Sequence, residues 1–272
     1  MKRHNFFQPS AALRGPTAHA HWITPDWPIP DAVRAVCTSR AGGVSLPPFD
    51  SLNLGDHVGD QLQAVTRNRQ ILREAMDARP VFLKQVHGSH SILLDASTTD
   101  GTQADGCVAL ERGLACTMMV ADCLPILFCA ADGAAVAAAH AGWRGLAGQG
   151  GRGVVESTWD CLQRHCGARA ADTLVWLGPC IGPDAFEVGT EVKAAFEAQS
   201  SQAGDMFRPH HGGKWLADLQ GLARQRLRAL GFEKIYGNDG SQDWCTVAQA
   251  ELFFSHRRDR VSGRIAAAVW RV

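Results

Sequence analysis

The hydrophobic and polar positions along the chain follow two periods, one typical of strands and one typical of helices. Short apolar runs bounded by glycine, proline or charged residues predict buried strands at residues 33–37, 80–86, 91–95, 114–120, 125–130, 134–139, 174–177 and 265–272. Apolar side chains three to four residues apart predict amphipathic helices at residues 61–76, 153–165, 188–199 and 219–230. Because the two kinds of element interleave along the whole chain, the pattern indicates an α/β fold.

The length and composition are typical of one globular unit. No linker, repeat or low-complexity stretch divides the 272 residues, so we predict a loose N-terminal arm at residues 1–30 and a single domain at 31–272. The 27 basic and 27 acidic residues cancel, which argues against a nucleic-acid or membrane-surface partner. The nine cysteines form no CxxC pair, and the N-terminus lacks a signal-peptide core. We therefore expect a cytoplasmic protein with reduced thiols.

Three side chains of the metal-ligand type each stand at the end of an apolar run: His87, Cys123 and His140. Reactive groups at strand ends, beside glycines that permit tight turns, are common in α/β enzymes. Zinc binds imidazole nitrogen and thiolate, and a catalytic zinc site has three protein ligands and an open fourth position. Water at that position has a pKa of about 7. The three residues therefore suggest one zinc site.

The isolated spacing of these residues leaves other interpretations open. The two histidines could be core residues with satisfied hydrogen bonds, and Cys123 a small buried thiol. Alternatively, a cysteine beside an imidazole has a lowered pKa and could act as a nucleophile without metal. The same thiolate does not ligate zinc and attack a substrate at one time, so the sequence leaves both roles open.

Eight short blocks of the sequence occur in the order found in one bacterial family. The blocks are residues 38–45, 51–60, 68–69, 85–88, 121–125, 140–145, 178–183 and 253–258. From about Thr38 onward the chain resembles the YfiH-type family. Its members have been described as laccase-domain multicopper polyphenol oxidoreductases, purine nucleoside phosphorylases and peptidoglycan editing factors.

The resemblance carries expectations about the fold and the site. It implies a single catalytic domain with a layered α/β fold and mixed sheets, related to cytotoxic necrotizing factor-like cysteine hydrolase folds. It also implies that His87, Cys123 and His140 are the zinc ligands and the catalytic residues.

Several polar and aromatic residues surround the expected site. Guanidinium forks suit phosphate or carboxylate, and the candidates are Arg40, Arg69, Arg144, Arg257 and Arg258. We predict that Arg69 and Arg144 bind phosphate or substrate, with a surface ion pair as the alternative for each. Asn68 would orient a substrate hydroxyl or cap backbone.

Other candidates are less specific. Trp143 would stack on a purine base or fill the core. His57 and His256 are either site members or surface residues. The pair His210 and His211 is interpreted as part of a loop.

The resemblance implies a zinc-dependent purine nucleoside enzyme. Its reactions would be phosphorolysis of adenosine, inosine, guanosine and methylthioadenosine, and deamination of adenosine, with nucleoside and phosphate as small-molecule partners. The alternative within the family is an amidase that removes misincorporated serine from a peptidoglycan precursor. A copper polyphenol oxidase fits less well, because His19 and His21 form the one HxH pair in the sequence. A zinc-stabilised partner protein is the alternative from another class, but structural zinc usually has four protein ligands.

Overall fold

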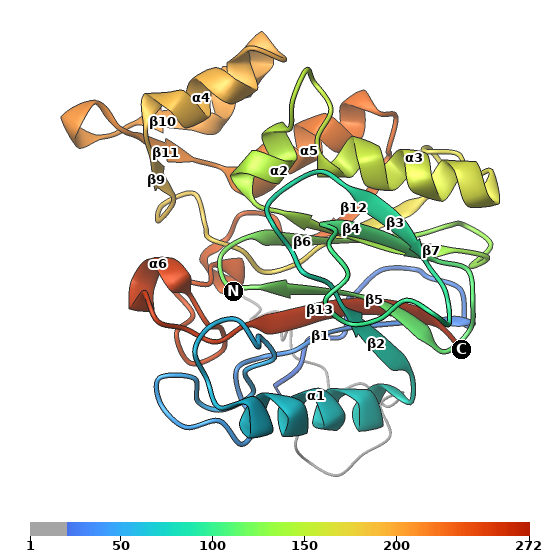
Figure 1. Cartoon of the computed structure of the whole chain (residues 1–272). Helices are drawn as coiled ribbons and strands as arrows, with labels where there is room; N and C mark the ends of the chain where they lie inside the picture. The colour runs from blue at the N-terminus through green and yellow to red at the C-terminus, as the bar shows by residue number, and fades with distance from the viewer. Residues whose placement is uncertain (1–20) are drawn as a thin grey trace, which may run out of the picture.

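The computed structural model describes residues 21–272, which form four stacked layers (Figure 1). Helix α1 covers a four-stranded sheet. This sheet packs against a six-stranded sheet, whose outer face is covered by α2, α3 and α5 (Figure 1). Both sheets contain parallel and antiparallel neighbours. The expected layered α/β fold with mixed sheets is confirmed.

The four-stranded sheet has the order β1-β13-β5-β2. Strand β1 (Val33–Cys37) pairs antiparallel with β13 (Ile265–Arg271), the last strand of the chain. Strand β13 pairs antiparallel with β5 (Leu114–Val120), which pairs parallel with β2 (Arg79–Phe82). Helix α1 (Leu62–Met76) lies on the outer face of this sheet (Figure 1).

The six-stranded sheet has the order β12-β8-β6-β7-β4-β3. In chain order its strands are β3 (Ser91–Leu94), β4 (Gly106–Ala109), β6 (Leu124–Cys129), β7 (Val136–Ala141), β8 (Leu174–Leu177) and β12 (Lys234–Gly237). The helices on its outer face are α2 (Trp143–Ala147), α3 (Val154–Cys166) and α5 (Leu219–Ala229).

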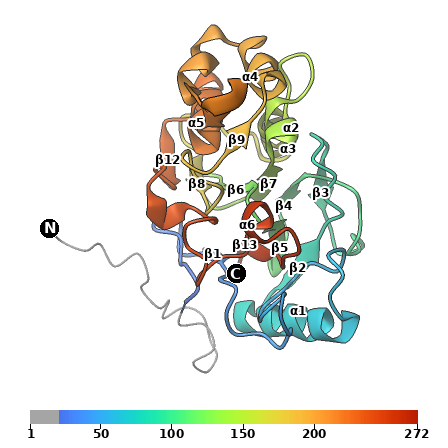
Figure 2. The same ribbon diagram turned by 90° about the vertical axis from the view of Figure 1, so that its left-hand side faces the viewer.

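The remaining elements lie at one side of the two large sheets. Strands β9 (Glu187–Val188), β10 (Phe207–Pro209) and β11 (Trp215–Ala217) form a small sheet beside α4 (Thr190–Glu197). Figure 2 shows α6 (His256–Asp259) in front of the sheet ends, between the two large sheets. Three short 3-10 helices complete the described elements: η1 (Ser201–Met206), η2 (His211–Gly213) and η3 (Gln242–Trp244).

The two-residue period of β5 builds two core layers at once. Side chains on alternate residues of a strand point to opposite faces of the sheet. Cys116 and Met118 pack between the two large sheets, whereas Ala115 and Met119 pack toward α1. All seven residues of β5 are therefore buried, which explains why the strand is a continuous apolar run in the sequence.

Several predicted boundaries differ from the structure. The strand predicted at 80–86 ends at Phe82, because the next residues turn toward a buried carboxylate described below. The strand predicted at 134–139 extends to Ala141, so His140 lies within it and pairs with Pro125. The helix predicted at 188–199 begins only at Thr190, because residues 187 and 188 pair with β11.

The N-terminal arm is partly packed onto the domain. Residues 1–20 lie outside the described residues. Trp22, Ile23 and Trp27 are buried, and the backbone of Ile23 exchanges two hydrogen bonds with Cys37 at 2.8 and 2.9 Å. The prediction of a loose arm therefore fails from residue 22 to residue 30. Within residues 21–272, no helix combines the length and apolar character required to cross a bilayer.

Candidate metal centre

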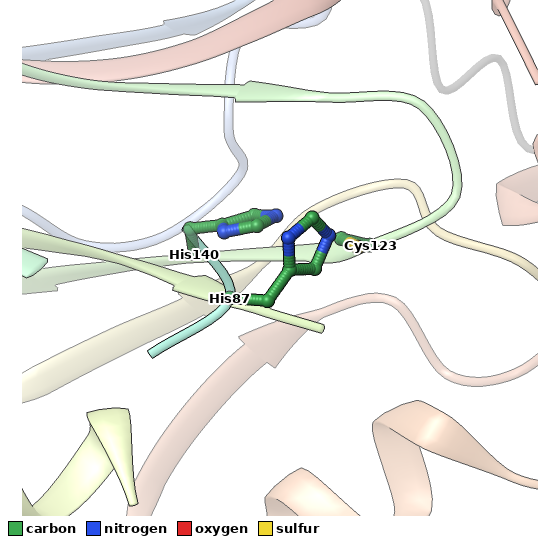
Figure 3. A group of neighbouring side chains, drawn as sticks. All are labelled: His87, Cys123 and His140. Atoms are coloured by element: carbon green, nitrogen blue, oxygen red, sulfur yellow. The ribbon is translucent and has the colours of Figure 1, made fainter. Parts of the chain in front are cut away.

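Three loops and strand ends bring His87, Cys123 and His140 together. His87 lies between β2 and β3, Cys123 directly precedes β6, and His140 is the penultimate residue of β7. One ligand atom from each lies within 4.8 Å of the others, and Figure 3 shows the three side chains pointing toward one another. Residues up to 53 positions apart in the sequence thus form one cluster.

A single buried carboxylate, Asp105, orients both histidines. Its oxygens accept the backbone N–H groups of Val86, His87 and Gly88 at 3.2, 2.9 and 2.8 Å. One oxygen also accepts Nδ1–H of His140 at 2.9 Å. The backbone at His87 has a φ of 59°, which is uncommon for a residue other than glycine, and the three amide contacts stabilise it. Because Nδ1 of His140 donates to Asp105, its Nε2 is left to bind a metal.

Without a metal, the charges at the site favour a thiolate beside a protonated imidazole: burial lowers the pKa of His140, but Cys123 and Asp105 outweigh that effect and raise it to about 9. Burial raises the pKa of the Cys123 thiol, but His140 and His87 outweigh that effect and lower it to about 6. Burial also raises the pKa of Asp105, but the hydrogen bonds from His140 and from backbone amides bring it below its usual value. The cluster therefore favours a thiolate and an ionised carboxylate.

Two neighbouring residues shape the space around the ligands. A Cβ atom at Gly142 would lie 2.9 Å from both Cys123 Sγ and His87 Cδ2, so only glycine fits without displacing them. Asp122 has a φ of 89°, and its carboxylate accepts the hydroxyl of Thr246 and the backbone N–H of Arg257, both at 2.6 Å. These bonds fasten the Cys123 loop to α6.

The donor set fits zinc or a similar borderline ion. Two imidazoles and one thiolate provide three ligands, and the aspartate that holds the outer nitrogen of His140 is the usual partner of a metal-binding histidine. The ligands also line a cavity of about 500 Å³, which leaves room for water or substrate at a fourth position. The arrangement equally contains a thiolate beside an imidazole, so a Cys–His nucleophile remains its metal-free alternative.

The cavity is rich in basic and aromatic side chains. Its basic residues beyond the ligands are His57, Arg144, His256, Arg257, Arg260 and Arg264. Trp143 and Phe186 provide aromatic walls, and the guanidinium of Arg144 stacks on Trp143 at 4.4 Å from the ring centre. Of the described residues that line the cavity, one, Asp122, is acidic. The cavity therefore suits an anionic or aromatic ligand.

The structure separates the three residues predicted to bind phosphate or substrate. Arg144 lines the cavity, but Arg69 and Asn68 do not. Arg69 donates from Nε to the Leu54 carbonyl at 2.9 Å, pairs with Asp56 at 3.1 Å and stacks on Phe82 at 4.2 Å. Its guanidinium is therefore occupied by the protein itself.

Asn68 is fully buried and fixes backbone. Its amide nitrogen donates to the Ser45 hydroxyl and to the carbonyls of Ser51 and Asn53, and its oxygen accepts the N–H of Val44 at 2.9 Å. The substrate-orienting role predicted for Asn68 does not agree with this position. The alternative role, binding of backbone, does.

Three contributors to the site were not predicted from the sequence. Asp105 lies before the short strand β4, and Arg260 and Arg264 lie between α6 and β13. Their one sequence signal is proximity to family blocks, and their roles depend on contacts across the fold. His57, His256 and Arg257, which were candidates, do line the cavity. Arg40 and Arg258 instead bind backbone carbonyls and neighbouring aspartates.

A second group of ligand-type side chains lies near the small sheet. Glu187, His210 and His211 offer atoms within 4.8 Å of one another. Glu187 is ion-paired with Lys214, and none of the three lines the cavity among the described residues. The group is therefore separate from the site built on His87.

Comparison with known proteins places this fold and site in a defined class. The description "multi-copper polyphenol oxidoreductase laccase" belongs to a family that matches residues 34–272. A Pseudomonas aeruginosa protein named purine nucleoside phosphorylase is 48% identical over 250 residues, covering 92% of this chain and 98% of the relative. The YfiH protein of Escherichia coli, which carries the same enzyme name, is 47% identical over 250 residues, with 91% and 98% covered.

Solved structures of similar proteins have the same fold as this chain. A Neisseria meningitidis protein of the family DUF152 superimposes with a TM-score of 0.85 at 41% identity, covering 92% of this chain and 99% of that one. YlmD of Geobacillus stearothermophilus gives 0.84 at 32% identity, with 98% of both chains covered. The layered α/β fold is thus that of the laccase-domain proteins. The chain belongs to this YfiH/DUF152 family, as its sequence blocks predicted.

Proposed function

We propose that the protein is a zinc-dependent purine nucleoside enzyme of the cytoplasm. It would carry out phosphorolysis of adenosine, inosine, guanosine and methylthioadenosine, and deamination of adenosine. The observation that carries the proposal is the opening of the His87, Cys123 and His140 cluster into a cavity lined by an indole and by arginines. Relatives at 46–48% identity carry the name purine nucleoside phosphorylase, which supports the same proposal.

Each wall of the cavity has a role in this proposal. Trp143 and Phe186 would bind the planar base through aromatic contacts. Arg144 presents a guanidinium to the cavity and would bind an oxyanion. Asp105 would hold the two histidine ligands in the orientation that zinc requires. Zinc bound by these residues would act as a Lewis acid and lower the pKa of water to about 7.

The two reactions require different alignments of one nucleoside. In phosphorolysis, a bond forms between a phosphate oxygen and C1′ of the ribose while the bond from C1′ to the base breaks. In deamination, water replaces the amino group at C6 of the base and ammonia leaves. One rigid pose would place only one of these carbons about 3 Å from its attacking atom. We therefore propose two poses in one cavity, which makes inosine a competitive inhibitor of adenosine deamination.

One panel of products tests the proposal. Purified zinc-loaded protein is incubated with adenosine or inosine plus phosphate, and with a muramyl-serine peptidoglycan precursor. Hypoxanthine and ribose-1-phosphate support the nucleoside enzyme, and both are expected to disappear in the Cys123→Ala variant. Release of serine without turnover of any purine nucleoside would replace this proposal with the editing amidase. Turnover of neither class of substrate would contradict both.

A laccase role is less compatible with the described donors. Coupled oxidation and oxygen reduction by several coppers needs several clusters rich in histidine. Residues 21–272 bring together two groups of three ligand-type side chains, and only the one built on His87 lines the cavity. Oxidation of a phenolic substrate by copper-loaded protein, measured beside the product panel, tests this role directly.

A further inference from the structure

Four arginines line the cavity without a carboxylate partner. They are Arg144 in α2, Arg257 in α6, and Arg260 and Arg264 in the segment between α6 and β13. Fourteen ion pairs form within residues 21–272, and none of these four guanidiniums takes part. Arg144 and Arg260 are exposed, whereas Arg257 and Arg264 are partly buried. Unpaired charge that is partly removed from water, as in these two, is costly unless a ligand of opposite charge binds it.

Arg264 is the most firmly built of the four. Its backbone N–H donates to the Asn53 side chain at 2.9 Å, and its carbonyl accepts the N–H of Leu54 at 3.1 Å. The absence of a side chain at Gly55 makes room for it, since a Cβ atom there would lie 2.8 Å from Arg264 Cγ. The side chain is thus seated in a groove made by residues 53–55.

The guanidinium of Arg264 retains free donors. One terminal nitrogen donates to the carbonyls of Ser262 and Gly263 at 2.9 and 3.0 Å, and Nε and the other terminal nitrogen make no hydrogen bond within residues 21–272. Burial lowers the pKa of Arg264, and the negative groups that oppose this effect are Cys123 and Asp122. Arg264 lines the same cavity as these two residues.

Arg257 lines the same cavity and is held in a similar way. Its backbone N–H is fixed by Asp122, one terminal nitrogen donates to the Glu187 carbonyl at 3.0 Å, and its plane lies 5.7 Å from the Phe186 ring centre. These contacts orient the guanidinium, but within residues 21–272 no carboxylate forms an ion pair with it. Two positioned guanidiniums thus line one cavity.

We propose that Arg264 and Arg257 form a phosphate subsite in the cavity. The inference rests on the proposed function and assigns its anionic co-substrate to α6 and the segment after it rather than to Arg69. A tetrahedral dianion accepts hydrogen bonds from several N–H groups at once, which matches the free donors of two guanidinium forks. Inorganic phosphate and the phosphate of a nucleotide share this chemistry.

Arg69 has a supporting position in this arrangement. It binds the Leu54 carbonyl and Asp56, and so holds the same loop that seats Arg264 from the other side. A change at Arg69 would therefore act on phosphate through Arg264. Arg69 is a positioning residue, and Arg264 makes the contact.

Calorimetric titration with inorganic phosphate, without nucleoside, tests the subsite. Zinc-loaded wild-type protein is compared with Arg264→Gln, Arg264→Lys and the matched surface variant Arg67→Gln, whose arginine is exposed on α1. We expect the Kd for phosphate to rise roughly 10- to 100-fold in Arg264→Gln and less in Arg264→Lys. Arg67→Gln should bind like the wild type. Zinc content is measured in every sample, so that phosphate bound to the metal stays constant across the series.

The outcomes separate this subsite from the proposed function. Unchanged phosphate binding in folded, zinc-loaded Arg264→Gln would overturn the inference, even if the enzyme splits nucleosides. Loss of binding supports the subsite, even if no nucleoside is split. If Arg264→Gln fails to fold, Arg257→Gln is titrated in its place, with the same expectation and the same overturning result. Displacement of phosphate by AMP but not by adenosine would assign the subsite to a phosphate carried by a nucleotide.

Discussion

Two groups of residues that line the cavity are held in place by different contacts. We call His87, Cys123 and His140 the ligand wall, and Arg257 and Arg264 the arginine wall. The ligand wall is held by internal bonds: Asp105 satisfies four donors, and the strand β7 fixes His140. The arginine wall is held by carbonyls and aromatic rings, and it leaves charge and donors unused. The ligand wall is therefore formed before any substrate arrives, whereas the arginine wall is complete only with an anion bound. Changes in the first should abolish the site, and changes in the second should weaken it.

The largest effect is expected from Cys123→Ala. Removing the thiolate leaves two imidazoles, which hold zinc far less well than three ligands. We expect the purified variant to lose its zinc in elemental analysis and to lose both nucleoside reactions. Cys166→Ala removes a partly buried thiol that does not line the cavity, and it is the matched control. Full zinc content and turnover in Cys123→Ala would show that the site is assigned wrongly.

The next effect is expected from Asp105→Asn, which keeps the shape of the side chain but removes its charge. Asparagine has one accepting oxygen, so the bonds to His140 and to the three amides are not all retained. Loss of such a partner typically weakens metal affinity about 10- to 100-fold. Competition with a zinc chelator measures the change. Asp132→Asn, at an exposed turn, is the control, and equal zinc affinity in both variants would contradict the role of Asp105.

The ligand wall could be predicted from the sequence because its residues stand in local motifs, whereas Arg264 in the arginine wall could not. His87, Cys123 and His140 stand in short motifs at the ends of apolar runs, and both signals are local. The strands β5 and β6 were found because they are continuous apolar runs, and the helices α1 and α5 because their apolar residues recur every three to four positions. Local pattern was therefore sufficient for the ligand wall and for most of the layers.

The parts that were missed depend on contacts between distant residues. Strands β4, β10, β11 and β12 have only three or four residues each, so they carry little periodicity. Asp105 acts on His140, 35 positions away, and Arg264 is seated by Asn53, 211 positions away. Arg69 and Asn68 do not line the cavity, and a motif does not reveal whether its polar groups face a cavity or the protein interior. Only the fold determines that difference.

A smaller effect is expected from Arg144→Lys, because the arginine lines the cavity but is held only by its contact with Trp143. Lysine retains the charge and loses the planar fork. We expect the KM for phosphate to rise several-fold, roughly the loss of one charged hydrogen bond, with little change in deamination, which uses no phosphate. Steady-state assays of both reactions on one preparation measure this. Equal losses in the two reactions would indicate a role for Arg144 in folding.

The smallest effect on the site is expected from Asn68→Ala. This variant tests whether Asn68 contributes to anion binding. The change leaves the N–H of Val44 and the carbonyls of Ser51 and Asn53 without their buried partner. Such losses cost about 3 kcal/mol in the free energy of unfolding, which denaturant titration measures. Zinc content should stay within twofold or so of the wild type, since Asn68 does not reach the cavity, and the KM for phosphate should rise at most a few-fold through the loosened Asn53. A large rise in that KM at unchanged stability would return Asn68 to the substrate site, and would move the anion toward Arg69 and away from Arg264.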